Sequence, residues 1–134
     1  VSRSIDMIDC TGKKALIVDD NKVNLKIAAR LLERYNFEIT EVNSGAECIE
    51  LVKNNKYDIM FLDHMMPEMS GVETLQTLKQ SGYKIPPAVA LTANYYNGLK
   101  EEYLAQGFVD YLAKPIEFRE LNRIIDKVFE KDNT

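Results

Sequence analysis

The sequence predicts an α/β fold in which helices cover both faces of a five-stranded parallel sheet, a doubly wound arrangement. Short apolar segments and segments with apolar residues at helical spacing alternate five times along the chain. Three short segments, Ala15–Val18, Ile59–Leu62 and Ala88–Leu91, are apolar without interruption, which is typical of strands buried on both faces. No segment repeats another, so we expect a single unit of this class.

The first half of the chain supplies two strands and two helices. Ala15–Val18 is followed by apolar residues at helical spacing between positions 25 and 32, which predicts a helix with one buried stripe. Glu38–Val42 predicts a strand of moderate burial. Ser44 and Glu47 then have the spacing of a capping box, so a second helix is expected to begin there.

The middle of the chain contains the clearest central strand, Asp58–Leu62, which ends next to Asp63. After a loop, Ser70 and Glu73 have the spacing of a second capping box and predict the third helix. Pro86–Pro87 predicts a loop, because proline supplies no backbone donor to a sheet.

The last third of the chain repeats the alternation. Ala88–Leu91 predicts a buried strand, Leu99–Gln106 a weak helix and Phe108–Leu112 a short strand. Phe118–Val128 carries its apolar residues on one face and predicts the final helix. Residues 1–12, in contrast, are polar and without period, which indicates a linker or the tail of a preceding region.

The composition is that of an ordinary globular domain, with 134 residues of which 46% are hydrophobic and 28% charged. The net charge of -4 argues against a nucleic-acid-binding surface. The sequence contains neither a membrane-spanning apolar run nor a signal peptide, so we expect a cytoplasmic domain without membrane contact. Cys10 and Cys48 are compatible with a disulfide, but reduced thiols are the favoured interpretation.

Polar side chains stand at the carboxyl ends of four of the five predicted strands. The first strand is followed by Asp19–Asp20, the third by Asp63 and the fourth by Thr92, and Lys114 comes shortly after the fifth. Because the carboxyl ends of parallel strands meet at one edge of a sheet, we expect these side chains to form one site.

Three carboxylates at this edge need compensating positive charge. At roughly 4 Å, each pair repels by about 4 kcal/mol in an effective dielectric of about 20. Lys114 offsets only part of this repulsion, which predicts a divalent cation, Mg²⁺ first and Mn²⁺ as the alternative. A cation there lets Asp63 attack a phosphoryl group, while Thr92 and Lys114 contact the transferred oxygens.

Five short motifs, at these spacings, make the chain similar to the receiver domain of two-component response regulators. The motifs are Val18-Asp19-Asp20-Asn21, Phe61-Leu62-Asp63-His64-Met65-Met66-Pro67, Ser70-Gly71, Leu91-Thr92-Ala93 and Lys114-Pro115. The resemblance covers residues 13–130 and leaves 131–134 as a C-terminal tail. It implies a flavodoxin-like three-layer sandwich with strand order 2-1-3-4-5.

The resemblance implies that Asp63 is the phosphorylated residue. Asp20 and Asp63 would bind the cation directly, Met65 would contribute its backbone carbonyl, and Asp19 would act mostly through water.

The resemblance also assigns the residues that respond to phosphorylation. Thr92 and Lys114 would contact the phosphoryl group, and Tyr111 occupies the family's aromatic switch position. Lys114–Pro115 stands where the family usually has a cis peptide.

The motif that begins at Val18 and ends at Asn24 is similar to receivers fused to hybrid sensor histidine kinases. Together with a start at Val1 rather than Met and the lack of a DNA-binding domain, it favours a receiver attached to a kinase over one from a transcription factor, and a membrane anchor in the parent chain is compatible with this interpretation. A stand-alone regulator, or a receiver cut from a longer regulator, is the alternative. The implied partners are a histidine kinase or a histidine phosphotransfer domain, and the domain alone is not expected to be an enzyme beyond slow autodephosphorylation.

Other classes of protein share this topology but fit the residues less well. A phosphatase of the haloacid dehalogenase type needs a second Asp two residues after the nucleophile, where this chain has Met65. A flavin-binding domain needs a phosphate loop where Asp19–Asp20 would repel phosphate. A degenerate receiver is disfavoured because every expected site residue is present. His64 is expected to point away from Asp63, as a structural or surface residue.

Overall fold

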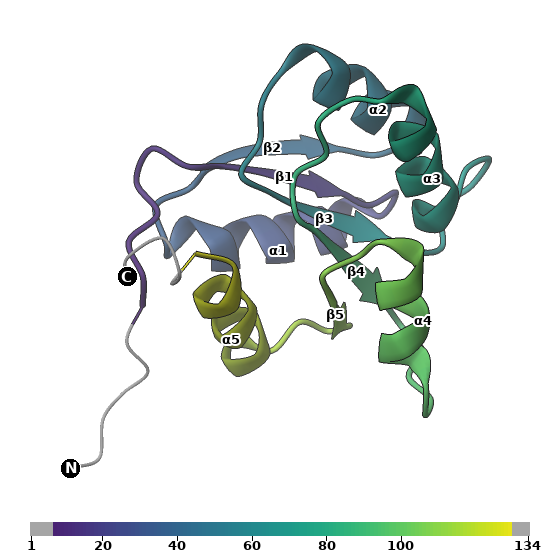
Figure 1. Ribbon diagram of the computed structural model, residues 1–134. Helices are drawn as coiled ribbons and strands as arrows, with labels where there is room; N and C mark the ends of the chain where they lie inside the picture. The colour runs from purple at the N-terminus through teal and green to yellow at the C-terminus, as the bar shows by residue number, and fades with distance from the viewer. Residues whose placement is uncertain (1–6, 130–134) are drawn as a thin grey trace.

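Five parallel strands form one sheet in the order β2-β1-β3-β4-β5, and five helices cover it (Figure 1). The structure, a computed structural model, describes residues 7–129. The strands are β1 (Lys14–Val18), β2 (Glu38–Val42), β3 (Ile59–Asp63), β4 (Ala88–Thr92) and β5 (Asp110–Ala113). The helices are α1 (Lys22–Glu33), α2 (Gly45–Asn54), α3 (Gly71–Ser81), α4 (Leu99–Gln106) and α5 (Phe118–Phe129). The predicted fold class and strand order are therefore confirmed.

Within the described range, no helix combines the length and the apolar character that crossing a bilayer requires.

Two hydrophobic cores fill the space between the sheet and its helices. Helices α1 and α5 cover one face, and α2, α3 and α4 cover the other. Because neighbouring residues of a strand point to opposite faces, Ala15 and Ile17 join the first core while Leu16 and Val18 join the second. The central strands are thus buried on both sides, as their uninterrupted apolar sequences predict.

The two cysteines lie in different cores. Cys10 packs with α1 and α5, and Cys48 stands on the buried face of α2, on the other side of the sheet. Both thiols are free and buried, which confirms the favoured interpretation over a disulfide. Burial raises the pKa of Cys10 to about 11 and that of Cys48 to about 12, so neither is a thiolate at neutral pH.

The described part of the predicted N-terminal linker packs against the domain. Cys10 is fully buried, and its amide donates a hydrogen bond of 2.7 Å to the carbonyl of Tyr35. Met7 and Ile8 contact the same core. The packed unit therefore begins before residue 13, while the predicted tail at 131–134 lies outside the described residues.

Two features in the second half of the chain bear on the predicted boundaries. β5 begins at Asp110 rather than at Phe108, because Phe108 packs into the second core with its ring centroid 5.3 Å from that of Tyr103. The predicted capping box of Ser70 and Glu73 forms completely at the start of α3.

The expected capping box at the start of α2 forms only in part. The amide of Glu47 donates to the Ser44 side chain, as predicted. The Glu47 carboxylate, however, accepts from the amide of Asn43 rather than from that of Ser44. This shift by one residue still supplies an acceptor to a free amide before the helix.

Candidate functional site

Asp63 is the last residue of β3 and lies at the centre of the carboxyl edge of the sheet. Its neighbours in the sheet are β1 and β4, and it is only 3% exposed. The turn behind it is held close by Gly71, whose amide donates to the carbonyl of His64 at 2.9 Å. A β-carbon on Gly71 would collide with the backbone oxygen of Asp63, so only glycine allows α3 to begin this close to the end of β3.

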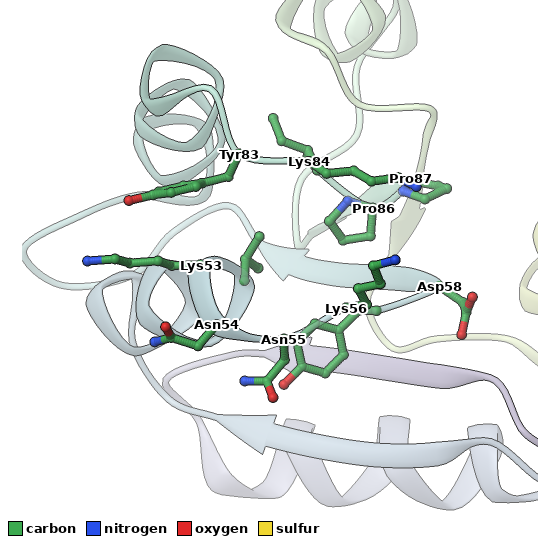
Figure 2. A pocket seen from close by; sticks show the side chains of 12 residues that line it. Lys53, Asn54, Asn55, Lys56, Asp58, Tyr83, Lys84, Pro86 and Pro87 are labelled. Atoms are coloured by element: carbon green, nitrogen blue, oxygen red, sulfur yellow. The ribbon is translucent and has the colours of Figure 1, made fainter.

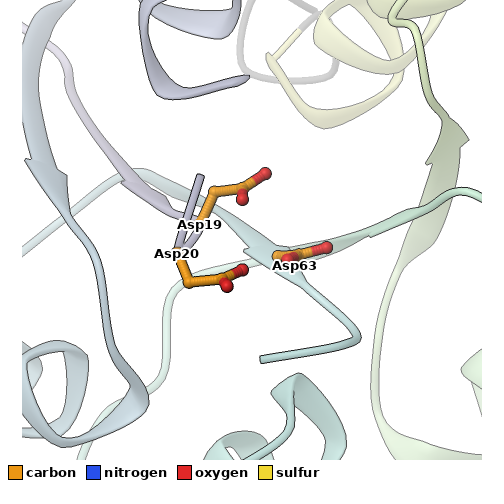
Figure 3. A group of neighbouring side chains, drawn as sticks. All are labelled: Asp19, Asp20 and Asp63. Atoms are coloured by element: carbon orange, nitrogen blue, oxygen red, sulfur yellow. The ribbon is translucent and has the colours of Figure 1, made fainter. Parts of the chain in front are cut away.

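Asp19 and Asp20 follow β1 and face Asp63 across the gap between two neighbouring strands (Figure 3). One carboxylate oxygen from each of the three residues lies within 4.8 Å of the others. Asp19 is 1% exposed, whereas Asp20 is exposed to solvent. Asn21 fixes this turn, because its amide donates to Asp19 Oδ1 at 2.9 Å and its side chain caps α1.

Lys114 approaches the same carboxylates from the loop after β5. Its Nζ lies 2.7 Å from Asp63 Oδ1 and 3.1 Å from Asp19 Oδ2. The backbone holds Lys114 in place, since its amide donates to the carbonyl of Thr92 at 2.8 Å. The Lys114–Pro115 peptide bond is cis, as the sequence resemblance implied.

The environment shifts the pKa values of the two central groups in the same direction. Burial raises the pKa of Asp63 to about 6; the hydrogen bond from Lys114 opposes this effect, and the charges of Asp19 and Asp20 add to it. Burial alone would lower the pKa of Lys114, but its contacts with Asp63 and Asp19 outweigh burial and raise it. Asp63 is thus mostly ionised at neutral pH, and burial, more than the charge of its acidic neighbours, is what disfavours its carboxylate form.

The residues of this site fit a divalent cation. Asp19 Oδ2 is buried and, among residues 7–129, accepts no aligned hydrogen bond, although Lys114 lies near it as an ion-pair partner. Three carboxylates opposite one ammonium leave excess negative charge, and a set of oxygen donors with one solvent-exposed member suits Mg²⁺. The side chain of the fourth predicted ligand, Met65, is 72% exposed in the loop after β3, and a role for its carbonyl stays a prediction.

Within the described residues, neither Thr92 nor Tyr111 has a hydrogen bond to the three carboxylates in this structure. Thr92 ends β4 and is 4% exposed; its hydroxyl accepts from the amide of Asn94 at 3.1 Å and donates to the carbonyl of that residue at 3.0 Å. The partly buried ring of Tyr111 stacks on Tyr95, with the centroids 6.1 Å apart. Thr92 therefore has to exchange its present bonds before it can contact a group on Asp63.

The geometry agrees with a comparison of the sequence to protein families. The model of the response regulator receiver domain matches residues 15–126, most of the chain. The chain belongs to the response regulator receiver family. Every strand end that contributes a site residue lies within the matched range.

Individual relatives connect this receiver to sensor kinases. It is 35% identical over 111 residues to the signal transduction histidine-protein kinase BarA of Shigella flexneri, which covers 82% of this chain and 12% of that protein. It is 33% identical over 140 residues to histidine kinase 3 of Arabidopsis thaliana, covering 88% of this chain and 14% of the relative. The receiver thus spans a small part of the length of these kinases.

A solved structure supports the comparison of the sites. The receiver domain of the sensor histidine kinase PA1611 of Pseudomonas aeruginosa PAO1 superposes with a TM-score of 0.77 at 30% identity, covering 87% of this chain and 97% of that domain. That structure has a magnesium ion coordinated in its active-site cleft.

Two residues beside the site of this receiver were not among the predicted functional residues. His64 points away from the carboxylates, as expected, and its Nδ1 forms a hydrogen bond of 2.7 Å with the hydroxyl of Tyr103. Tyr103 comes four residues after Leu99, and this helical spacing is the sequence signal that places it on the face of α4 toward the sheet. Nothing in the sequence indicates that its hydroxyl reaches the loop after β3.

The receiver also has a pocket of about 510 Å³ at the opposite, amino edge of the sheet (Figure 2). Lysines and tyrosines line it between the ends of α2 and α3 and the starts of β3 and β4; they are Lys53, Lys56, Tyr57, Tyr83 and Lys84. These lysines stand close to helix C-termini, where the helix dipole favours positive charge. The pocket lies at the opposite edge from the acidic site, and the helix dipoles account for the lysines that line it.

Proposed function

We propose that this receiver domain stores a signal as a phosphoryl group on Asp63, with a divalent cation held by Asp19, Asp20 and Asp63. One observation carries the proposal: a buried carboxylate with a raised pKa lies 2.7 Å from Lys114 and within 4.8 Å of two further carboxylates. A group of acids this close is expensive to maintain unless it binds a cation or transfers a charged group.

The chemistry follows from the positions of these side chains. A carboxylate oxygen of Asp63 attacks the phosphorus of a phosphohistidine donor, so that an O–P bond forms and the P–N bond breaks. The electron pair of the P–N bond stays on the imidazole, which takes a proton from solvent. Lys114 already forms an ion pair with Asp63, and after the transfer its ammonium can pair with a phosphoryl oxygen. When bound, the cation neutralises the acids and the transferred oxygens, as Mg²⁺ or Mn²⁺ can.

Thr92 completes the arrangement after transfer. Its hydroxyl is hydrogen-bonded to the backbone of Asn94, at the end of the strand next to the one that Asp63 ends. A phosphoryl group adds roughly 1.5 to 2 negative charges there, which favours a Thr92 that donates to a phosphoryl oxygen. The space that Thr92 leaves lets Tyr111 turn inward, and the surface of α4, β5 and α5 changes with it.

The relatives support a proposal for the donor and for the parent chain. Because the relatives are histidine kinases of which this chain spans 12% and 14%, we infer that the domain belongs to a hybrid histidine kinase and receives phosphoryl groups from a histidine kinase or phosphotransfer domain. A stand-alone regulator, or a receiver cut from a longer regulator, is the alternative. In either context the domain by itself is a phosphoacceptor of the cytoplasm, not an enzyme acting on a separate substrate.

Acetyl phosphate with Mg²⁺ provides a direct test. Intact-mass spectra of the acid-quenched protein should show the addition of one phosphoryl group, and Asp63→Asn should abolish it. Asp126→Asn on α5 is the matched control and should be modified as the wild type is. If Asp63→Asn still gains a phosphoryl group, the assignment of Asp63 is wrong.

A further inference from the structure

Polar side chains of α3 hold the C-terminal end of α4. The carbonyl of Gln106, the last residue of α4, accepts a hydrogen bond of 3.2 Å from Gln76 Nε2 and one of 3.1 Å from Lys79 Nζ. The last carbonyls of a helix have no partner within the helix, so these two donors satisfy a group that would otherwise depend on water. The ammonium of Lys79 also interacts favourably with the helix dipole at this end.

A third hydrogen bond holds the second turn of α4 from the side of the sheet. The hydroxyl of Tyr103 lies 2.7 Å from Nδ1 of His64, and the two rings meet edge to face. The backbone of His64 is itself fixed, because its amide donates to the carbonyl of Leu91 and its carbonyl accepts from the amide of Gly71, each at 2.9 Å. The second turn of α4 is therefore attached to both the sheet and α3.

The N-terminal end of α4 lacks attachments of this kind within residues 7–129. Its cap residue is Gly98, which has no side chain that could accept from the free amides of the first turn. The amide of Leu99 donates to the carbonyl of Tyr96, whose hydroxyl donates to the Glu102 carboxylate at 2.8 Å. These partners belong to the helix itself or to the loop just before it, so they move together with the first turn.

The two ends of α4 are thus held by contacts of different kinds. Leu99 joins the second core through apolar contacts, which are non-directional and tolerate a small tilt of the helix. The loop before α4 rests on β5 through the stacked rings of Tyr95 and Tyr111, but Tyr111 is itself proposed to move. Hydrogen bonds depend steeply on distance and angle, so the second turn cannot tilt without losing those to His64, Gln76 and Lys79.

We propose that α4 turns about its C-terminal end when Asp63 is phosphorylated, with Gln76 and Lys79 as positioning residues that anchor this end. The inference rests on the proposed function of Asp63 and adds which part of α4 moves. The loop before α4 contains Asn94, whose backbone is the present partner of the Thr92 hydroxyl. When Thr92 turns toward the phosphoryl group, it releases this loop, so the loop and the first turn of α4 move while the last turn stays in place.

The competing explanation is that Gln76 and Lys79 only cap the end of α4 and contribute stability. Removing these two donors would then weaken the domain but leave the response of α4 to phosphorylation as it is in the wild type. An anchor predicts a different result, because without it the displacement spreads to the C-terminal end of the helix. The two explanations therefore differ in where α4 responds, and not in how stable the protein is.

The experiment compares the amide chemical shifts of α4 with and without acetyl phosphate and Mg²⁺. In the wild type we expect large changes in the first turn and a small change at Gln106. Gln76→Met combined with Lys79→Met keeps the length of both side chains and removes both donors. The change at Gln106 should then rise by about threefold, the factor that corresponds to one weak neutral hydrogen bond. Gln80→Met combined with Lys84→Met makes the same two exchanges at exposed positions and should respond as the wild type does.

An unchanged response at Gln106 in the first double variant, or equal responses of the two ends of α4 in the wild type, would overturn the inference. A second measurement uses the unsubstituted protein, in case that variant does not fold. Phosphorylation should lower the hydrogen-exchange protection of the Leu99 amide by about threefold and leave that of the Gly107 amide, which donates to the carbonyl of Leu104, unchanged. Equal losses at both amides contradict the proposal. Failure of the proposed function looks different, because the wild type would then not be phosphorylated on Asp63 at all.

Discussion

Lys114 Nζ lies 2.7 Å from Asp63 Oδ1, so the residue that follows β5 is paired with the residue that ends β3, across the intervening strand β4. The pair brings one positive charge to a group of three acids. It also depends on the backbone hydrogen bond between Lys114 and Thr92, which ties the loop after β5 to the end of β4. The positions of three strand ends are thus linked through one ammonium group.

Replacing this ammonium should change both the acidity and the reactivity of Asp63. Since the contact with Lys114 lowers the pKa of Asp63, Lys114→Gln should raise that pKa above about 6 in metal-free protein, as measured by NMR of ¹³C-labelled carboxylates. The rate of phosphorylation by acetyl phosphate should fall by roughly 10²-fold, as when one charge-stabilising donor is lost. Lys56→Gln, which removes a lysine at the opposite edge, should alter neither quantity.

Mg²⁺ should stabilise the folded domain. A cation that binds only the folded state at 100 times its dissociation constant adds about 2.7 kcal/mol to the free energy of unfolding, which raises Tm by on the order of 10 °C. Asp20→Ala removes one ligand and should reduce this increase, while Asp126→Ala should preserve it. A wild-type Tm that does not respond to Mg²⁺ would contradict the assignment of the acidic group as a metal site.

Gly71→Ala should destabilise the domain although alanine is the better helix former. In an unobstructed helix position the substitution would stabilise by about 1 kcal/mol. Here the new β-carbon meets the backbone oxygen of Asp63, and overpacking of this kind costs about 1–3 kcal/mol. Urea denaturation should therefore show a lower free energy of unfolding, and the phosphorylation rate should fall because the end of β3 moves. A stabilised Gly71→Ala protein would show that α3 can shift without strain.

The acidic site was predictable from the sequence because strand ends are a local signal. Uninterrupted apolar runs identify the buried strands, and the residue after each run must then appear at one edge of a parallel sheet. Asp63 and Lys114 are 51 positions apart by their numbers, yet the alternation of strands and helices alone brings them together. Periodicity also suffices to assign Tyr103 to the buried face of α4.

Other features depend on contacts that no local pattern contains. The hydrogen bond between His64 and Tyr103 joins residues 39 positions apart, and it depends on how α4 packs against the sheet. Cys10 lies in a polar segment without period, yet it is buried in the first core, and its amide donates a hydrogen bond to the carbonyl of Tyr35. The expected capping box at Ser44 forms only in part, because the amide of Asn43, and not that of Ser44, donates to the Glu47 carboxylate.

A second group of charges should control stability at low pH. Asp110 is fully buried at the start of β5, and its Oδ2 accepts from Arg123 at 3.1 Å and from Lys127 at 2.9 Å. Burial alone would raise its pKa, but the bond from Lys127, the backbone amide of Tyr111 and Arg123 outweigh burial and hold the pKa below its ordinary value. A group with a lowered pKa in the folded state binds protons more weakly there than in the unfolded chain.

The sign of the pH effect follows from this difference. The stabilisation by Asp110 is fully present above the pKa of an unfolded aspartate, about 3.9, and is lost as the pH falls through the lower folded value. Asp110→Asn should therefore lower the free energy of unfolding by about 2 kcal/mol at pH 7, the size of a hydrogen bond to a charged group. Urea titrations should show the two proteins converging below about pH 4. A constant difference between pH 7 and pH 3 would mean that packing, and not the charge of Asp110, holds β5 against α5.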